Sequence, residues 1–195
     1  MTIVALMDAL RTLCLNELKG MTFQAAVQKG DTEEVYKEPH GYLMRLPEVE
    51  NTEKLAPYFI IQPGKSQHIQ KSGDEPRFFV PIRMVFCHYC EDNERGEVEL
   101  MNIMERIQIR LLKDVTFGGA FMLNVHEPVE IEPYYEELGQ YHAGELRCTF
   151  VLPAIYREVE GFGKKDGIRK RSLGSFGKPD NFGDADGFGD LGSFG

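Results

Sequence analysis

The chain has 195 residues, enough for one ordinary domain with some chain left over, and its content of 42% hydrophobic and 27% charged residues is typical of a globular protein. Its formal net charge of -9 argues against broad binding of naked DNA, which usually requires a basic surface. No apolar run is long enough for a membrane span, the N-terminus lacks the basic region and cleavage site of a secretory signal, and four cysteines make no disulfide framework, so we expect a reducing compartment.

The N-terminal part begins with a helical pattern. Apolar residues recur every three or four positions over residues 3–18, which predicts an amphipathic helix. Thr2 can cap its start and Gly20 can end it. Prolines and glycines then interrupt residues 21–55, which predicts an irregular stretch with short strands.

The centre contains two apolar, aromatic-rich runs that predict strands at 56–63 and 77–90, joined by a polar hairpin loop. Pro81 lies inside the second run, and proline cannot donate a backbone hydrogen bond, so it predicts an edge position or a bulge. The spacing of apolar residues then changes to every three or four positions, and residues 97–113 predict an amphipathic helix.

The last part of the folded region predicts two more strands, at 120–125 and 145–152, separated by an acidic, tyrosine-rich connection. Pro153 ends the second strand, and regular structure is expected to stop near residue 156. The order of these elements predicts an α+β fold, with helices packed on a small, mixed and mainly antiparallel sheet.

The composition changes near residue 160. Residues 1–160 carry 16 basic and 26 acidic side chains, whereas residues 161–195 carry six and five, together with ten of the 20 glycines. We therefore expect an α/β domain over 1–158 and a low-complexity extension rich in Gly and Phe over 159–195. In this extension Phe-Gly recurs every six residues, which suggests either repeat expansion or a series of docking side chains: Phe176, Phe182, Phe188 and Phe194.

Cys87 and Cys90 form a CxxC pattern, which can ligate zinc or carry out redox chemistry. The other two cysteines are isolated, and no second ligand pair occurs at a suitable spacing. The pair also lies at the end of a predicted strand, where the two side chains point to opposite faces. We interpret them as small buried residues, with a metal or redox site as the less favoured alternative.

The sequence predicts no catalytic site, no metal site and no cofactor. Each of the five histidines lacks a partner at ligand spacing, and no phosphate loop, nucleophile elbow or dinucleotide motif occurs. Tyrosines are enriched in the centres of interfaces. The acidic connection therefore predicts an interface through Tyr134, Tyr135 and Tyr141.

A resemblance to a known family lies in residues 56–158. The segments YFIIQPGKSQ, RFFVPIRMVFCHYCED and GEVELMNIMERIQIRLLKD lead to FGGAFMLN and to the acidic stretch PVEIEPYYEELGQYHAGELRCTFVLPAIYRE. Together they resemble a minor tail or tail-completion protein of long-tailed bacteriophages, of the tail terminator type. The extension from residue 159 is an addition to that pattern.

The resemblance implies a structural virion protein, assembled in the host cytoplasm, with a tail-terminator-like fold. Such a protein forms a ring, usually a hexamer, at the head-proximal end of the tail tube. There it ends tube polymerisation and joins the major tail tube protein to the head-tail connector, while DNA passes through the lumen. The acidic charge suits such a lumen, because like charges do not trap phosphates. Another neck component, such as a head-completion or stopper protein, is the alternative.

Overall fold

The computed structural model describes residues 2–26, 35–48, 55–70, 76–114, 116–119, 121–135 and 139–154. The chain divides into two units, Met1–Arg157 and Glu158–Gly195, and the described residues belong to the first unit. The four phenylalanines at 176, 182, 188 and 194 and the predicted end of regular structure near 156 lie outside the described residues, so these expectations stay predictions. Neither described helix is long and apolar enough to cross a membrane.

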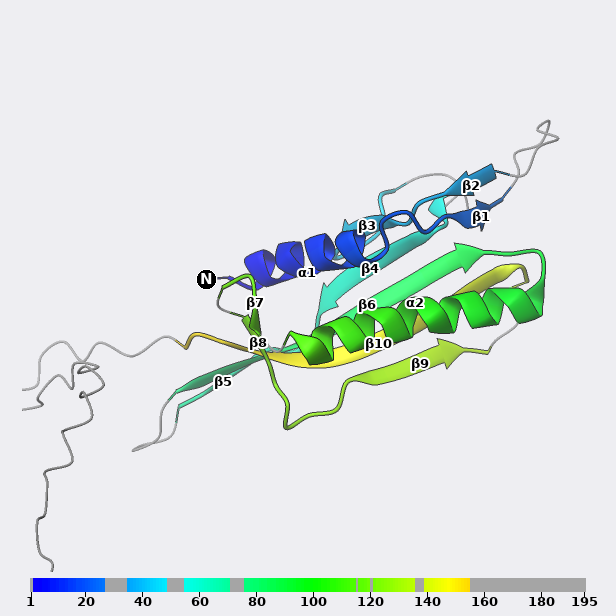
Figure 1. Cartoon of the computed structure of the whole chain (residues 1–195). Coiled ribbons are helices and arrows are strands. Elements are labelled where there is room, and N and C mark those ends of the chain that lie inside the picture. The colour runs from blue at the N-terminus through cyan, green and yellow to red at the C-terminus, as the bar shows by residue number, and fades with distance from the viewer. Residues whose placement is uncertain are drawn as a thin grey trace, which may run out of the picture. The chain divides into compact units, whose positions relative to one another are not determined.

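Helix α1 spans Ile3–Glu17, close to the predicted range (Figure 1). The Thr2 hydroxyl accepts a hydrogen bond from the backbone N–H of Ala5 and caps the helix start, as predicted. The chain leaves the helix through Gly20, whose φ of 79° is a left-handed conformation that glycine adopts without steric cost.

Helix α2 spans Asn93–Lys113 and begins four residues before the predicted start at 97. The reason is a cap that hydrophobic periodicity does not reveal, because the Asp92 side chain accepts a hydrogen bond from the backbone N–H of Arg95 at 3.0 Å. The first turn is therefore set by a polar residue, and apolar residues enter the pattern only afterwards.

The described strands form two sheets. A two-stranded sheet pairs β1 with β2, and an eight-stranded sheet has the order β3-β4-β6-β10-β8-β7, with β5 added to β6 and β9 added to β10. Only β3 and β4 run parallel, so the chain is an α+β protein with a mixed, mostly antiparallel sheet, as predicted. The strand bounds are β1 Phe23–Ala25, β2 Val35–Lys37, β3 His40–Leu43, β4 Tyr58–Pro63, β5 Gln67–Ile69, β6 Arg77–Tyr89, β7 Thr116–Phe117, β8 Phe121–Leu123, β9 Glu130–Tyr134 and β10 Tyr141–Leu152.

The predicted edge position of Pro81 was wrong, because β6 lies inside the sheet between β4 and β10. The alternative, a bulge, agrees with the register, since the three residues 64–66 lie opposite only two residues of β6, 80–81. Pro81 is tolerated because of where it falls along the strand. Its carbonyl accepts a hydrogen bond from Gly64, so its nitrogen faces the gap in which β4 has ended and β5 has not yet begun. No ladder hydrogen bond is lost there.

The acidic connection was also assigned wrongly. Strand β9 lies within it, and β10 begins at Tyr141, not at 145. The first half of β10 pairs with β9 on one side and with β6 on the other. Long-range pairing therefore orders a stretch whose glutamates and proline have low intrinsic strand preference.

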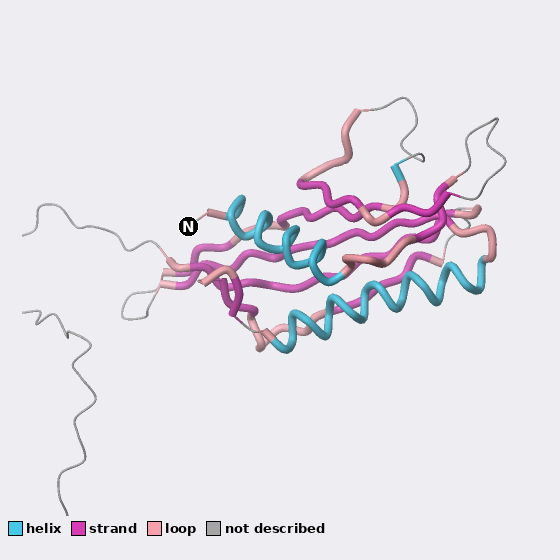
Figure 2. The backbone as a smooth tube through the Cα atoms, turned by 45° about the horizontal axis from the view of Figure 1, so that its top comes forward, coloured by secondary structure: helices cyan, strands magenta, loops and turns pink. Residues whose placement is uncertain are grey.

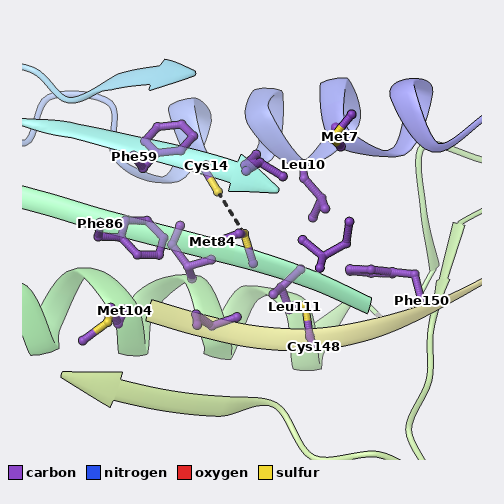
Figure 3. Packing of buried hydrophobic residues seen from close by; sticks show 14 of the residues in the cluster. Met7, Leu10, Cys14, Phe59, Met84, Phe86, Met104, Leu111, Cys148 and Phe150 are labelled. Carbon is purple, nitrogen blue, oxygen red and sulfur yellow. Dashed lines mark hydrogen bonds between the residues drawn. The ribbon is translucent and has the colours of Figure 1, made fainter. Parts of the chain in front are cut away.

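Both helices cover the same face of the sheet (Figures 1 and 2). Helix α1 lies against β3 and β4, and α2 lies against β6, β9 and β10. Between the two layers sits a hydrophobic core in which Met84 and Phe86 of β6 meet Cys14 of α1 and Met104 of α2 (Figure 3). Gly144 leaves room in β10 for Met104, because a Cβ there would lie 3.0 Å from its sulfur.

Candidate interaction surface

We call the face of the sheet that points away from the helices the open face. Alternate residues of β4 and β6 point to it, and they are half-buried where their neighbours are fully buried. The strand register places Tyr42, Ile60 and Val85 side by side in one row across β3, β4 and β6. In the next row Tyr58 and Cys87 are aligned. The described residues place no helix over this apolar stripe.

A cluster of ion pairs continues the open face onto β10 and β9. At its centre is Glu145, whose side chain has no exposed area. Arg83 and Arg147, each about half exposed, contact its two carboxylate oxygens, and the Tyr134 hydroxyl donates to one of them. Arg83 also donates to the Tyr134 oxygen at 2.7 Å, and Arg147 lies 3.2 Å from Glu132.

The cluster keeps Glu145 charged. Burial by itself raises the pKa of this carboxyl, but the hydrogen bonds from Tyr134 and Arg83, together with the charges of Arg83 and Arg147, outweigh burial and lower the pKa overall. Burial raises the pKa of Tyr134, so its hydroxyl stays a donor. The result is a charged group that is already neutralised within the subunit, which reduces the cost of covering it with a partner.

One end of the open face is hollowed. The hollow has a volume of about 420 Å³ and lies beside the cluster, between β6, β10 and the loop that leads into β9. Its floor is apolar and its rim carries charge. The lining residues are Gly64, Pro81, Ile82, Arg83, Glu127, Pro128, Glu130, Arg147, Cys148 and Thr149.

The three tyrosines predicted as an interface have different surroundings. Tyr134 is held inside the ion cluster, and Tyr141 packs edge-on against Tyr89 with ring centroids 5.3 Å apart. Tyr135 is 80% exposed. Of the three tyrosines, Tyr134 and Tyr141 therefore make contacts within the subunit, and Tyr135 is exposed to solvent.

The CxxC cysteines are separated by the strand, as the sequence predicted. Cys87 lies on the open face beside Tyr58, and burial raises its pKa. Cys90 is buried, and both thiols are free. No group of three or more His, Cys, Asp or Glu side chains in the described part of the chain is arranged to hold a metal ion.

A buried histidine pair, which no local sequence pattern indicated, lies near the start of α2. His88 and His142 have ring centroids 5.4 Å apart. Nε2 of His88 lies 3.0 Å from the carbonyl oxygen of Gly96, and Nδ1 of His142 lies 2.9 Å from Glu97. Desolvation lowers the pKa of His88, although its hydrogen bonds to Gly96 and Tyr89 oppose the shift. The pair ties α2 to β6 and β10.

Comparisons with known proteins add little to this geometry. No family model and no curated protein matches the chain. Among the solved structures that match the chain, one is similar at 12% sequence identity with a TM-score of 0.42. The match covers 80% of this chain and 94% of that one. A similarity this weak carries no argument about function.

Proposed function

We propose that this chain is a structural subunit of a bacteriophage tail terminator. In this role it assembles into a ring, expected to be a hexamer, at the head-proximal end of the tail tube in the virion. The ring ends tube polymerisation and joins the tube to the head-tail connector. The observation that carries the proposal is the open face, a broad sheet surface for which the described chain provides no covering helix.

The chemistry of the open face suits a protein partner. Tyr42, Tyr58 and Ile60 are half-buried at an apolar stripe, and aromatic side chains are enriched in the centres of interfaces. The adjoining ion cluster pairs Glu145 with Arg83 and Arg147 within the subunit, so a partner can cover it without leaving this carboxylate without a counter-ion. Two packed layers with one face uncovered are expected to gain stability from a third layer.

The charge of the chain supports the same function. The 26 acidic and 16 basic side chains of residues 1–160 give an acidic subunit. A ring of such subunits would repel DNA phosphates, so DNA could slide through the lumen without being held. The major tail tube protein and the connector are the expected partners, and no cofactor is required for this role.

The experiment is to mix the purified full-length chain with tail tube protein from the same phage and to image the tubes by electron microscopy. We expect capped tubes of limited length and, in native mass spectrometry, a closed ring. A Val85→Arg variant places a charge in the apolar stripe and should abolish ring formation. Val4→Arg is the matched control, since Val4 is exposed on α1, outside the open face.

Tubes that grow equally long with and without the protein would contradict the terminator function. Binding to the portal-side ring in place of the tube would support the alternative, a stopper or head-completion protein. A Val85→Arg variant that assembles as the wild type does would show that the open face is not the contact surface. Circular dichroism of each variant checks that it is folded.

A further inference from the structure

We propose that the open face of one copy of this chain binds the C-terminal extension of a second copy. Two apolar spots on the open face each receive one phenylalanine of the Phe-Gly repeat. This inference rests on the proposed function, because it names the segment that joins neighbouring subunits of the ring.

The first spot is the apolar stripe described above. Its centre is Val85 of β6, which is aligned with Ile60 of β4 and, one strand further, with Tyr42 of β3. All three side chains are half-buried, and the described residues place no helix over them. The spot therefore offers apolar and aromatic surface to a partner.

The second spot lies further along the same face. Phe79 of β6 is aligned with Val151 of β10, which is aligned in turn with Met122 of β8. Phe79 and Val151 are half-buried, and Met122 is 46% exposed. Both neighbours of Met122 in β8 are buried in the core, so the Met122 side chain belongs to the open face.

Strand β6 fixes the distance between the two spots. Val85 and Phe79 are six residues apart, and this even number places both side chains on the same face of the sheet. At the rise of an extended strand, six residues span about 20 Å. Between the spots the surface is polar at Arg83, where the ion cluster lies, and hollowed beside Pro81. The open face thus changes from apolar to polar and back to apolar within six residues.

The extension has the same period in its sequence. Its repeated phenylalanines are six residues apart, so in an extended conformation they fall on one side of the chain at intervals of about 20 Å. A glycine follows each phenylalanine, and glycine has no side chain to hold the backbone away from the sheet. Each spacer also contains at least one aspartate. Two successive phenylalanines therefore match the two spots in spacing and in side, with a polar spacer over the polar part of the face.

The composition of the extension explains why it needs such a surface. Ten of the residues in 161–195 are glycines, and the phenylalanines are separated by polar residues, so the segment has too few apolar side chains to build a core of its own. Contact with an apolar surface removes the phenylalanine rings from water, which stabilises the bound state.

The length of the extension allows it to reach a second copy. Strand β10 ends at Leu152, and the 21 residues 155–175 lie between the described chain and Phe176. When extended they span about 70 Å, which exceeds the roughly 40 Å width of a domain of this size. Docking on the same chain would join no subunits. When each copy gives its extension to the next, the contact is head-to-tail, and such contacts form closed rings when the rotation between copies closes.

The test uses two full-length variants. The face variant carries Val85→Arg and Met122→Arg, which place one charge in each apolar spot. The extension variant replaces the four repeated phenylalanines by serine: Phe176→Ser, Phe182→Ser, Phe188→Ser and Phe194→Ser. We expect the assembly affinity of each variant alone to fall by about a hundredfold, tenfold for each spot. Light scattering coupled to size exclusion measures the mass.

Mixing the two variants is the decisive measurement. The face variant keeps an intact extension and the extension variant keeps an intact open face, so the two together can form one contact. We expect a 1:1 dimer that neither variant forms alone. This dimer cannot grow into a ring, because its remaining surfaces are the substituted ones.

Two further variants test the surface and the spacing. Val4→Arg with Val98→Arg also places two charges at exposed valines, but on the helices, and should assemble as the wild type does. One extra glycine in each spacer of the extension leaves the phenylalanines in place but makes the period seven. Successive phenylalanines then point to opposite sides of an extended chain, and we expect assembly to weaken at least tenfold.

Each result has a distinct meaning. If the wild type and the extension variant both form rings, the inference fails and the proposed function stands. If both variants lose the ring but form no dimer on mixing, the extension does not bind a second copy and the inference fails. Wild-type assembly by the variant with the longer spacers would contradict the match in spacing. If the wild type itself forms no ring, with or without tube protein, the proposed function fails too.

Discussion

Strands β6 and β10 present two faces of opposite character. On the face under the helices, Met84, Phe86 and Leu146 are fully buried in an apolar core. On the open face, Val85 lies next to Glu145, a carboxylate with no exposed area that is held by two arginines. One face is thus completed by the chain itself, while the other carries its own ion pairs. This difference is the reason why the open face, and not the helix layer, is the contact surface in the proposed function.

The most direct test of the difference between the two faces is a pair of identical substitutions at adjacent positions in one strand. Ile61 faces the core and is fully buried, whereas Ile60 faces the open side and is half-buried. Ile61→Ala should lower the free energy of unfolding by about 2–5 kcal/mol, because it leaves a cavity in the core. Ile60→Ala should cost about 1 kcal/mol or less in the isolated subunit, since water can fill the space. Urea titration measures both, and equal losses would contradict the two-face description.

The sequence predicted the helices and strands of the core face well, because helix periodicity, caps and strand preference depend on residues that are close together in the chain. Periodicity located α1, and a cap residue fixed its start at Thr2. The apolar runs that became β4 and β6 were also recognisable, because strand preference and burial agree there. The α+β class followed from these elements.

The open face could not be predicted in the same way. Arg83, Tyr134 and Glu145 belong to three strands and meet only after the sheet has formed. Strand β9 has glutamates and a proline, so no local signal marks it. His88 and His142 are likewise 54 positions apart in the sequence, and the antiparallel register of β6 and β10 pairs them directly. Contacts that depend on register cannot be derived from composition or spacing alone.

The second prediction tests the ion cluster. Glu145→Gln removes the charge that Arg83 and Arg147 share, and it should lower the free energy of unfolding by about 1–3 kcal/mol. The loss is limited because both arginines reach solvent. Glu132→Gln is the matched control and should cost less than about 1 kcal/mol, since its ion pair is exposed. Equal effects of the two substitutions would mean that burial of Glu145 does not matter.

The third prediction concerns how the free energy of unfolding depends on pH through His88, which is buried near α2, and through Glu145 of the ion cluster. Burial lowers the pKa of His88 below its ordinary 6.5, so the folded state binds a proton less readily than the unfolded state does. Its contribution to stability is therefore complete above pH 6.5 and is lost as the pH falls through the lowered value, at about 1.4 kcal/mol per unit of pKa difference. The lowered pKa of Glu145 has the same sign, but its contribution is lost only below its ordinary 4.5.

Urea titrations between pH 7 and pH 3 separate these two windows. A His88→Gln variant should lose the decline that begins near pH 6.5 and keep the acid-side decline, while Glu145→Gln should do the reverse. His126→Gln, on an exposed loop, controls for removal of a histidine. If the free energy of unfolding of the His88→Gln variant changes with pH as that of the wild type does, His88 is not the cause of the decline that begins near pH 6.5.

The smallest effect concerns two cysteines on opposite faces of the sheet. Cys148 points into the core and burial raises its pKa to about 12, whereas Cys87 points to the open face and is only partly covered. Native alkylation should therefore modify Cys87 first, and Cys148 only as fast as the chain unfolds. A Cys87→Ser substitution should change the free energy of unfolding by about 1 kcal/mol or less.

If ring assembly covers the open face, the same alkylation at Cys87 should slow in the assembled state and stay unchanged in the Val85→Arg variant. Equal rates in rings and in free subunits would place this part of the sheet outside the contact.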